Sequence, residues 1–318
     1  MPKVSVIIPV YGVEEYIERC SRSLFEQTLD DIEFLFIDDC SPDKSIDIIN
    51  SVIHDFPNRK PQVHIHRMEQ NSGQAAVRKW GMQNATGDFV IHCDSDDWVD
   101  RELYRAMYEK ALEGDADVVI CDYKVSNGTN VIKHVKGCVS TDCQITIQRQ
   151  LLQRDSWSLC NKLFRRTACY KELIYPNENM GEDMVLCMQM MFKCRRMAYV
   201  EGLYYYYYCN ESSISNLKSI QIHVRNYERL KANTDLLINI LKDKKVEHKK
   251  WIVNGLQYNA TITLLNLIHR DQQFRDMWMN TYPSANWRYL INPFVEAERR
   301  FKCFLALIGA YPFKKDRI

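Results

Sequence analysis

Apolar strands and amphipathic helices alternate along residues 1–100, and this alternation constrains the fold more than any other feature. Residues 3–10 form a nearly continuous β-branched run, as expected of a strand that is buried on both faces of a parallel sheet. Residues 14–27 follow with apolar side chains on one helical face. The succession continues with strands at 32–37, 63–68 and 89–93 and a helix at 73–85. It predicts a doubly wound, mostly parallel α/β sheet, whose ligands bind beyond the carboxyl ends of the strands.

The pattern changes after residue 100. A helix to about residue 113 and a strand at 117–123 are followed by mixed elements, and from Ile220 onward apolar residues recur at spacings of three and four, which indicates helices. We therefore expect a catalytic domain over residues 1–216 and a C-terminal helical region over 217–318. Within the catalytic domain, residues 1–100 would form the nucleotide-binding half and 101–216 the acceptor half.

The composition limits the binding partners and the cellular location that we expect. The chain has 42 Lys and Arg against 41 Asp and Glu, a net charge of +1, and it lacks the basic excess that nucleic-acid binding normally needs. No apolar run approaches the roughly 20 residues that a membrane span requires. The 12 cysteines include no Cys-x-x-Cys pair. We expect no nucleic-acid partner, and a cytoplasmic protein with reduced thiols.

Acidic residues follow two of the predicted strands at the binding edge. Asp38 and Asp39 come after the second strand, and Asp94, Asp96 and Asp97 come after the fourth. Neighbouring carboxylates repel one another and raise one another's pKa, and a divalent cation resolves this conflict. Mg²⁺ or Mn²⁺ suits such oxygen ligands and binds through one or two carboxylates and substrate phosphates. The alternative is a helix start with acidic caps, but capping needs one aspartate and not three.

The turn after the first strand offers no phosphate-binding loop of a known type. It reads Pro9-Val10-Tyr11-Gly12-Val13, without the Gly-x-Gly-x-x-Gly pattern of dinucleotide-binding domains, and no Walker lysine loop is present. The phosphates of a nucleotide would then be held by the metal, which agrees with the acidic cluster.

Five motifs occur in order along residues 3–215. They are the strand Val6–Tyr11, the turn Asp38-Asp39-Cys40-Ser41, the loop Asn71-Ser72-Gly73 with the helix residue Arg78, the cluster Asp94-Ser95-Asp96-Asp97, and Gly181-Glu182-Asp183. Together they resemble the family 2 glycosyltransferases with the glycosyltransferase A fold. That family usually has Asn at the position of Gly12 and Gly at the position of Cys40.

The resemblance implies an inverting transferase that uses a nucleotide-diphospho-sugar, with uridine as the expected nucleoside. Tyr11 would stack on the nucleobase, and Asp39 would accept a hydrogen bond from the ring N–H of uracil. Asp96 would reach the ribose or the metal, and Asp97 would ligate the metal. The other residues of the expected nucleotide-sugar site are Pro9, Asp38, Asn71, Gly73, Arg78 and Asp94.

The resemblance also assigns the catalytic pair. Carboxylates held by a cation are poor bases, so the proton of the acceptor hydroxyl must go elsewhere, and Asp183 is the expected general base. Glu182 would orient Asp183 or face solvent. Arg78 would contact the diphosphate or brace the acidic cluster, and its helical position favours bracing.

The expected reaction transfers the sugar to a hydroxyl of a saccharide or lipid-linked acceptor in the synthesis of a surface polysaccharide. One alternative is a nucleotidyltransferase for sugar phosphates, which would show a Gly-rich loop with Arg and Lys after the first strand. Another is a non-catalytic carbohydrate-binding protein on the same fold, against which the intact acidic motifs argue. Residues 294–318 combine basic and apolar side chains and predict either peripheral contact with the inner face of a membrane or a final helix docked on the core.

Overall fold

The computed structural model describes residues 1–209 and 219–310. The chain divides into two compact units, one of residues 1–150 and 155–211 and one of residues 151–154 and 212–318. The domain boundary expected between residues 216 and 217 lies outside the described residues.

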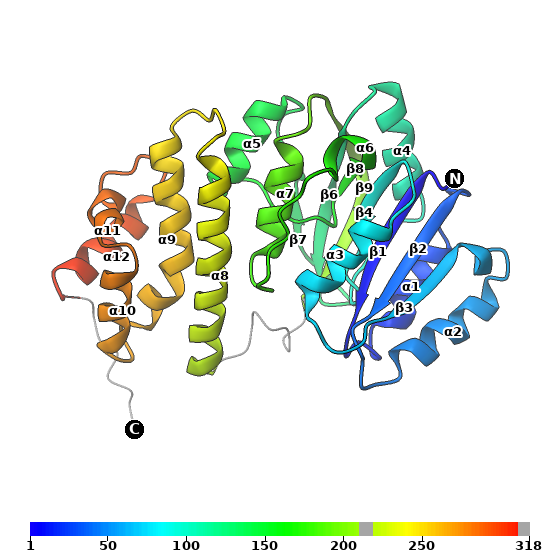
Figure 1. The fold of residues 1–318 in the computed structure, drawn as a ribbon, viewed down its shortest axis with the longest axis horizontal. Coiled ribbons are helices and arrows are strands. Elements are labelled where there is room, and N and C mark those ends of the chain that lie inside the picture. Colours follow the sequence, from blue (N-terminus) through cyan, green and yellow to red (C-terminus); the bar gives the residue numbers. More distant parts are fainter. Residues whose placement is uncertain (210–218, 311–318) are drawn as a thin grey trace. The chain divides into compact units, whose positions relative to one another are not determined.

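The first unit is built on one sheet with the strand order β3-β2-β1-β4-β8-β6-β9-β5, and β7 pairs with β6 (Figure 1). The strands are β1 (Val4–Val10), β2 (Ile32–Asp38), β3 (Val63–Arg67), β4 (Phe89–His92), β5 (Trp98–Val99), β6 (Val118–Ser126), β7 (Val131–Val135), β8 (Lys162–Arg165) and β9 (Met197–Tyr208). Strands β3, β2, β1 and β4 are parallel, as are β6 and β9. β8 runs antiparallel between β4 and β6, and β5 runs antiparallel to β9.

Helices cover both faces of this sheet. The helices of the first unit are α1 (Ile17–Phe25), α2 (Ser45–Asp55), η1 (Lys60–Gln62), α3 (Gln74–Asn84), α4 (Leu103–Glu113), α5 (Cys143–Leu151), α6 (Arg166–Cys169) and α7 (Glu182–Met191). α1, α2 and α4 share one core with alternate residues of β1, such as Val6 and Ile8. On the opposite face α3 packs so closely that a Cβ at Gly81 would lie 2.5 Å from Ile7. The predicted doubly wound, mostly parallel α/β fold is confirmed.

The second unit is helical, as the spacing of apolar residues predicts. It contains α8 (Ile220–Leu241), α9 (Lys249–Leu267), α10 (Gln273–Thr281), α11 (Pro283–Tyr289) and α12 (Ala297–Leu307). Its core gathers around the fully buried side chains of Trp278 and Tyr289. None of the helices among the described residues has the length and the apolar character that crossing a membrane requires.

Candidate active site

The carboxyl ends of β1, β2 and β4 lie side by side, and the first residues after them are those of the sequence motifs. Tyr11 follows β1, and 50% of its surface is exposed, which leaves its ring free to stack on a planar ligand. Pro9 lies within β1 opposite Ile37 of β2 and is partly buried. The motif strand therefore presents one exposed aromatic residue at the edge where α/β sheets bind ligands.

Both aspartates after β2 are buried and engaged. Asp38 accepts a hydrogen bond from the Ser41 amide at 2.7 Å and forms an ion pair with Arg67 at 2.7 Å. Asp39 accepts from the amides of Ser72 and Gly73 at 2.7 and 2.8 Å, one on each oxygen. Asp39 thus fixes the loop that contains the exposed Asn71. A nucleobase N–H would have to share an oxygen that the loop already uses.

Cys40 shows how the turn after β2 keeps its shape without the glycine of the related family. Its φ of 58° is in the left-handed region, where a residue with a Cβ is strained. The neighbouring contacts hold it there: the Cys40 thiol donates to the carbonyl of Met68, and the Gly12 amide donates to Ser41 Oγ at 2.8 Å.

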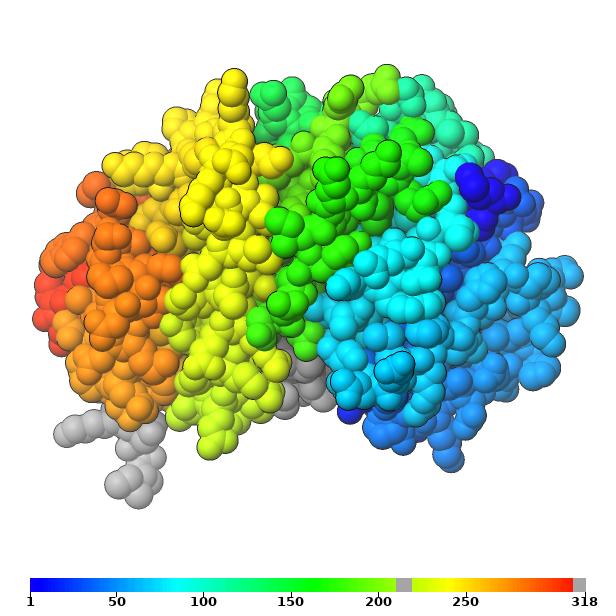
Figure 2. Space-filling view, in the orientation of Figure 1, coloured from blue at the N-terminus to red at the C-terminus, as the bar shows by residue number. Residues whose placement is uncertain are grey.

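Asn179 joins the loop after β3 to the segment before α7. Its Oδ1 accepts a hydrogen bond from the Ala75 amide at 3.0 Å. A Cβ added at Gly73, whose φ is 81°, would lie 2.2 Å from the Asn179 amide nitrogen, so this contact requires glycine. On the face shown in Figure 2, the cyan surface of α3 adjoins the green surface of the segment that leads into α7. Asn179 carried no signal in the sequence, because it lies outside the five motifs.

Arg78 bridges the two acidic motifs that carry the predicted chemistry. Its side chain is only 4% exposed; Nη2 donates to Asp94 Oδ1 at 2.8 Å, and Nε lies 3.4 Å from Glu182 Oε1. Burial lowers the pKa of Arg78, but the charges of Asp94, Glu182 and Asp183 outweigh it and raise this pKa above its usual value. Of the two predicted roles, bracing of the acidic groups is the one that these contacts describe.

His92, at the end of β4, is a further buried member of this network. Burial, and then the charge of Arg78, lower the pKa of His92 well below its usual value, so the ring is neutral. Arg78 Nη1 lies 3.2 Å from His92 Nδ1, and a guanidinium can only donate. Nδ1 is therefore the acceptor, and the proton sits on Nε2, which lies 3.5 Å from the Tyr170 hydroxyl. Sequence reasoning did not select His92, because this histidine has no ligand spacing to another histidine.

The three aspartates after β4 have different surroundings. Asp94 has a side chain that is 28% exposed and pairs with Arg78. Asp96 is partly buried, and its carboxylate accepts a hydrogen bond from its own backbone amide. Burial, and then the charge of Asp94, raise the pKa of Asp96 to about 6. Asp97 is fully buried, and its two oxygens accept from the Tyr205 hydroxyl and from the Tyr208 amide.

These surroundings bear on which of the three aspartates would hold a cation. Asp97 was predicted to ligate the cation, but both of its oxygens are engaged by β9 and none of its surface is exposed. Asp94 and Asp96 fit better, because they are partly exposed and raise each other's affinity for positive charge. Within the described residues no group of three or more His, Cys, Asp and Glu is arranged as a complete metal site. A cation with few protein ligands and several phosphate or water ligands, as Mg²⁺ has, is compatible with this pair.

Glu182 and Asp183 begin α7 after Gly181, whose φ is 81°. Burial, and then the charge of Asp183, raise the pKa of Glu182 to about 8. Glu182 is buried against Arg78, so of its two predicted roles facing solvent is excluded, and orienting Asp183 stays a prediction. Asp183 is partly exposed; burial raises its pKa, while Arg78 acts in the opposite sense. Asp183 Oδ1 accepts from the Met184 amide at 2.7 Å, and in the described part of the chain Oδ2 has no partner.

The chain is similar in sequence to known glycosyltransferases. The sequence model of glycosyl transferase family 2 matches residues 5–172. The chain is 28% identical over 281 residues to the putative glycosyltransferase EpsH of Bacillus subtilis, covering 83% of this chain and 77% of that protein. It is 26% identical over 226 residues to the glycosyltransferase GlyA of Streptococcus pneumoniae, covering 68% of this chain but only 32% of that protein.

A solved structure extends the comparison to the fold. The crystal structure of Staphylococcus aureus TarS residues 1–349 in complex with UDP-GlcNAc superposes with a TM-score of 0.74 at 22% identity, covering 97% of this chain and 88% of that chain. TarS is described as a poly(ribitol-phosphate) beta-N-acetylglucosaminyltransferase, and by sequence it is 29% identical to this chain over 213 residues, 65% of this chain and 35% of TarS. The fold that carries the site is thus shared with this structure.

Proposed function

This chain belongs to glycosyl transferase family 2, and from that premise we propose that it transfers a sugar from a UDP-sugar, with inversion, to a hydroxyl of a saccharide or lipid-linked acceptor. The observation that carries the proposal is the bridge made by Arg78, which holds the Asp94 cluster and the Glu182–Asp183 pair in one site. The UDP-GlcNAc in the TarS structure supports the choice of donor, and the poly(ribitol-phosphate) in the name of TarS supports a polymeric acceptor of the cell surface.

The donor half of the reaction would use the strand ends. Tyr11 would stack on the base, and Asp94 and Asp96 would hold Mg²⁺ or Mn²⁺ against the diphosphate. A bound cation supplies charge that stabilises the leaving diphosphate as the glycosidic bond breaks. Arg78, which is buried behind Asp94, pairs with that carboxylate and orients it.

The acceptor half would use Asp183. Its Oδ2 takes the proton of the acceptor hydroxyl while the hydroxyl oxygen attacks the anomeric carbon and the bond to the diphosphate breaks. Two adjacent carboxyl groups do not both ionise readily, and the pKa of about 8 makes Glu182 the protonated member at neutral pH. Asp183 is then the charged base, and its raised pKa makes it a stronger one.

A donor assay tests this proposal against the two alternatives. Purified full-length protein is incubated with a panel of UDP-sugars and Mn²⁺, and release of UDP is measured with and without saccharide acceptors. Metal-dependent release is the expected result. Binding of UDP-sugar without any release would favour the non-catalytic carbohydrate-binding protein. Condensation of UTP with a sugar 1-phosphate, with release of pyrophosphate, would favour the nucleotidyltransferase.

We also propose that the protein acts in the cytoplasm at the inner face of the membrane, and α12 supports the membrane contact. This helix buries Cys303, Ala306 and Leu307. Its other side carries Phe301, Phe304 and Ile308, which are 60%, 41% and 53% exposed. Lys302 and Arg300 lie next to this apolar face, although Lys302 also pairs with Glu298 at 2.8 Å. A helix with one face docked on a core and an apolar, cation-flanked face exposed is suited to an anionic lipid surface.

A further inference from the structure

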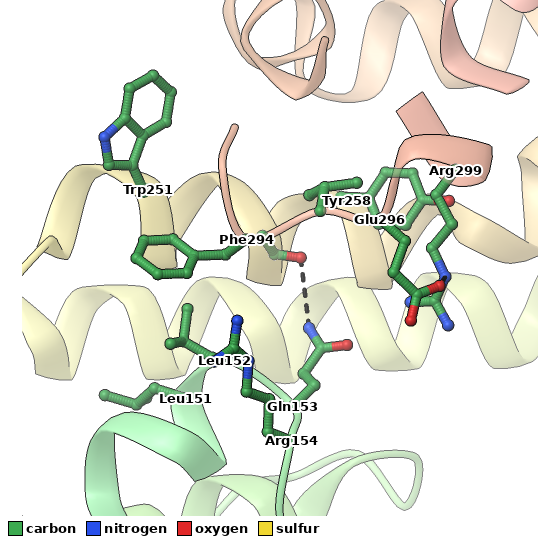
Figure 3. A pocket seen from close by; sticks show the side chains of 11 residues that line it. Leu151, Leu152, Gln153, Arg154, Trp251, Tyr258, Phe294, Glu296 and Arg299 are labelled. Atoms are coloured by element: carbon green, nitrogen blue, oxygen red, sulfur yellow. Dashed lines mark hydrogen bonds and ion pairs between the residues drawn. The ribbon is translucent and has the colours of Figure 1, made fainter. Parts of the chain in front are cut away.

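A pocket of about 220 Å³ lies entirely among residues of the second unit (Figure 3). Its walls come from three places: residues 151–154 after α5, helix α9, and the segment 294–299 that leads into α12. None of these residues belongs to the candidate active site. The volume is below the roughly 300–1,000 Å³ of pockets for drug-sized ligands, and it suits a ligand of the size of one sugar ring.

Aromatic side chains form one part of the wall. Trp251 and Tyr258 extend from α9, and Phe294 lies beneath Trp251 in the view of Figure 3. Trp251 and Phe294 are partly exposed, so their rings are in contact with the pocket and with solvent and are not committed to the core. Flat apolar rings at a solvent-exposed site offer a surface on which the C–H face of a sugar can rest.

Charged groups in the pocket are predominantly positive. The Arg154 guanidinium lies 5.8 Å from the centre of the Phe294 ring, and within the described ranges no carboxylate pairs with it. Arg299 Nε pairs with Glu296 at 3.2 Å, which leaves the two terminal nitrogens of Arg299 for another acceptor. The lining thus contains two guanidinium groups and one carboxylate, and an anionic ligand would balance the excess positive charge.

Two backbone positions beside the pocket, Gly255 and Gln153, are unfavourable for folding. Gly255 lies in the middle of α9, where glycine weakens a helix, yet a Cβ there would meet no heavy atom within 4 Å. Gln153 has a φ of 60°, in the strained left-handed region. Its Nε2 donates to the Gly255 carbonyl at 3.3 Å, the contact drawn in Figure 3. Gly255 therefore leaves open space in the pocket and is not required for close packing.

We propose that this pocket binds one anionic sugar unit, phosphorylated or carboxylated, of the acceptor saccharide. The aromatic rings would hold the ring of the sugar, and Arg154 and Arg299 would hold its anionic group. The assignment to the acceptor rests on the proposed glycosyltransferase function, whereas the ligand chemistry rests on the pocket itself.

The first experiment uses the full-length protein and three probes, glucose 6-phosphate, glucuronate and glucose. Binding is measured by calorimetry and by saturation-transfer NMR. The expected result is that at least one anionic sugar binds more tightly than glucose, and the better of the two identifies the anionic group. Arg154→Gln should weaken that binding at least about 10-fold, the loss expected for a charged hydrogen bond. Arg270→Gln, at an exposed arginine of the same unit outside the pocket, should leave it unchanged.

The second experiment fills the pocket. Gly255→Leu places a side chain in the free space and replaces glycine by a good helix former, so the melting temperature should stay the same or rise. Sugar binding should nevertheless be lost. A purely structural role of Gly255 predicts the opposite combination, lower stability and unchanged binding.

UDP binding, measured on the same samples, separates this inference from the proposed function. Intact UDP binding with no saturable binding of any of the three probes would refute the pocket proposal alone. Equal binding of the anionic probes by wild type and Gly255→Leu would also refute it, because the probes would then bind elsewhere. Saturable sugar binding without any UDP binding would support the pocket and refute the donor assignment.

Discussion

Arg78 Nε lies 3.4 Å from Glu182 Oε1, and this contact joins the helix after β3 to the start of α7. Arg78 also forms an ion pair with Asp94 at 2.8 Å, and Arg78→Met leaves this carboxylate without its buried cation. Breaking a buried pair in this way costs about 3–5 kcal/mol. We expect a loss of that size in the free energy of unfolding, measured by urea denaturation.

Two further variants sharpen this test. Arg78→Lys keeps the charge but cannot reach both carboxylates with one planar group, so it should recover only part of the stability. Arg105→Met removes an exposed arginine that pairs with Glu102 and Glu109, and it should cost less than about 1 kcal/mol. Equal losses for Arg78→Met and Arg105→Met would show that the bridge does not stabilise the site.

Asp183→Asn tests the general base. The substitution keeps the size of the side chain and removes the oxygen that takes the proton, so turnover should fall by roughly 10²–10⁴ while the affinity for the donor stays nearly the same. Steady-state kinetics and UDP calorimetry measure the two quantities. Asp88→Asn, at an exposed aspartate of the same unit, is the matched control. Turnover of Asp183→Asn within a few-fold of wild type would assign the proton to another residue.

The metal proposal predicts different effects for substitutions of Asp96 and of Asp97. Chelation should weaken UDP binding to wild type, and Asp96→Asn should remove this metal dependence. Asp97→Asn should keep it, because Asp97 is turned toward Tyr205 and Tyr208, but it should lower the free energy of unfolding by about 1–3 kcal/mol. Calorimetry of UDP binding in the presence of Mn²⁺ and of EDTA shows which of the two variants has lost the metal dependence. Metal-independent UDP binding by wild type would refute the cation site altogether.

Asp96 and Asp97 show how far the site could be predicted from the sequence. Strand periodicity placed the acidic motifs at the carboxyl ends of β2 and β4, because burial on both faces of a parallel sheet leaves a clear local pattern. The same pattern does not distinguish Asp96 from Asp97. The difference is made by Tyr205, which lies in a run of five tyrosines on a strand that is distant in sequence and adjacent in space.

Contacts between residues far apart in the sequence also explain why other site residues were not predicted. Asn179 and His92 take part in the site through partners that no local motif indicates. The left-handed backbone of Cys40 is likewise maintained by its contact with Met68, which directly follows β3, and not by its own preference. The sequence likewise left open whether Glu182 orients Asp183 or faces solvent, since a helix start is usually solvated and here Arg78 covers it.

The pH dependence of stability reports on Glu182. Its pKa is about 8 in the folded protein against 4.5 as the usual value, because of burial and then the charge of Asp183. A raised folded-state pKa contributes stability that is present in full below the unfolded value and is lost as the pH rises through the folded one. Wild type should therefore lose stability between about pH 4.5 and pH 8 relative to Glu182→Gln, which cannot titrate there. If the denaturation midpoints of the two proteins differ by the same amount at every pH from 5 to 9, this assignment is contradicted.

The exposed face of α12 predicts binding to anionic vesicles. Phe301 and Phe304 are one helical turn apart, and together they offer the apolar area that an interfacial helix inserts below the lipid headgroups. Full-length wild type should sediment with phosphatidylglycerol vesicles, less so with phosphatidylcholine vesicles and less so in high salt. The double variant Phe301→Ser with Phe304→Ser should lose this binding without unfolding, because both rings are exposed. Ile174→Ser, at an exposed apolar residue of the first unit, should not change it, and equal sedimentation of all three proteins would rule out α12 as the contact.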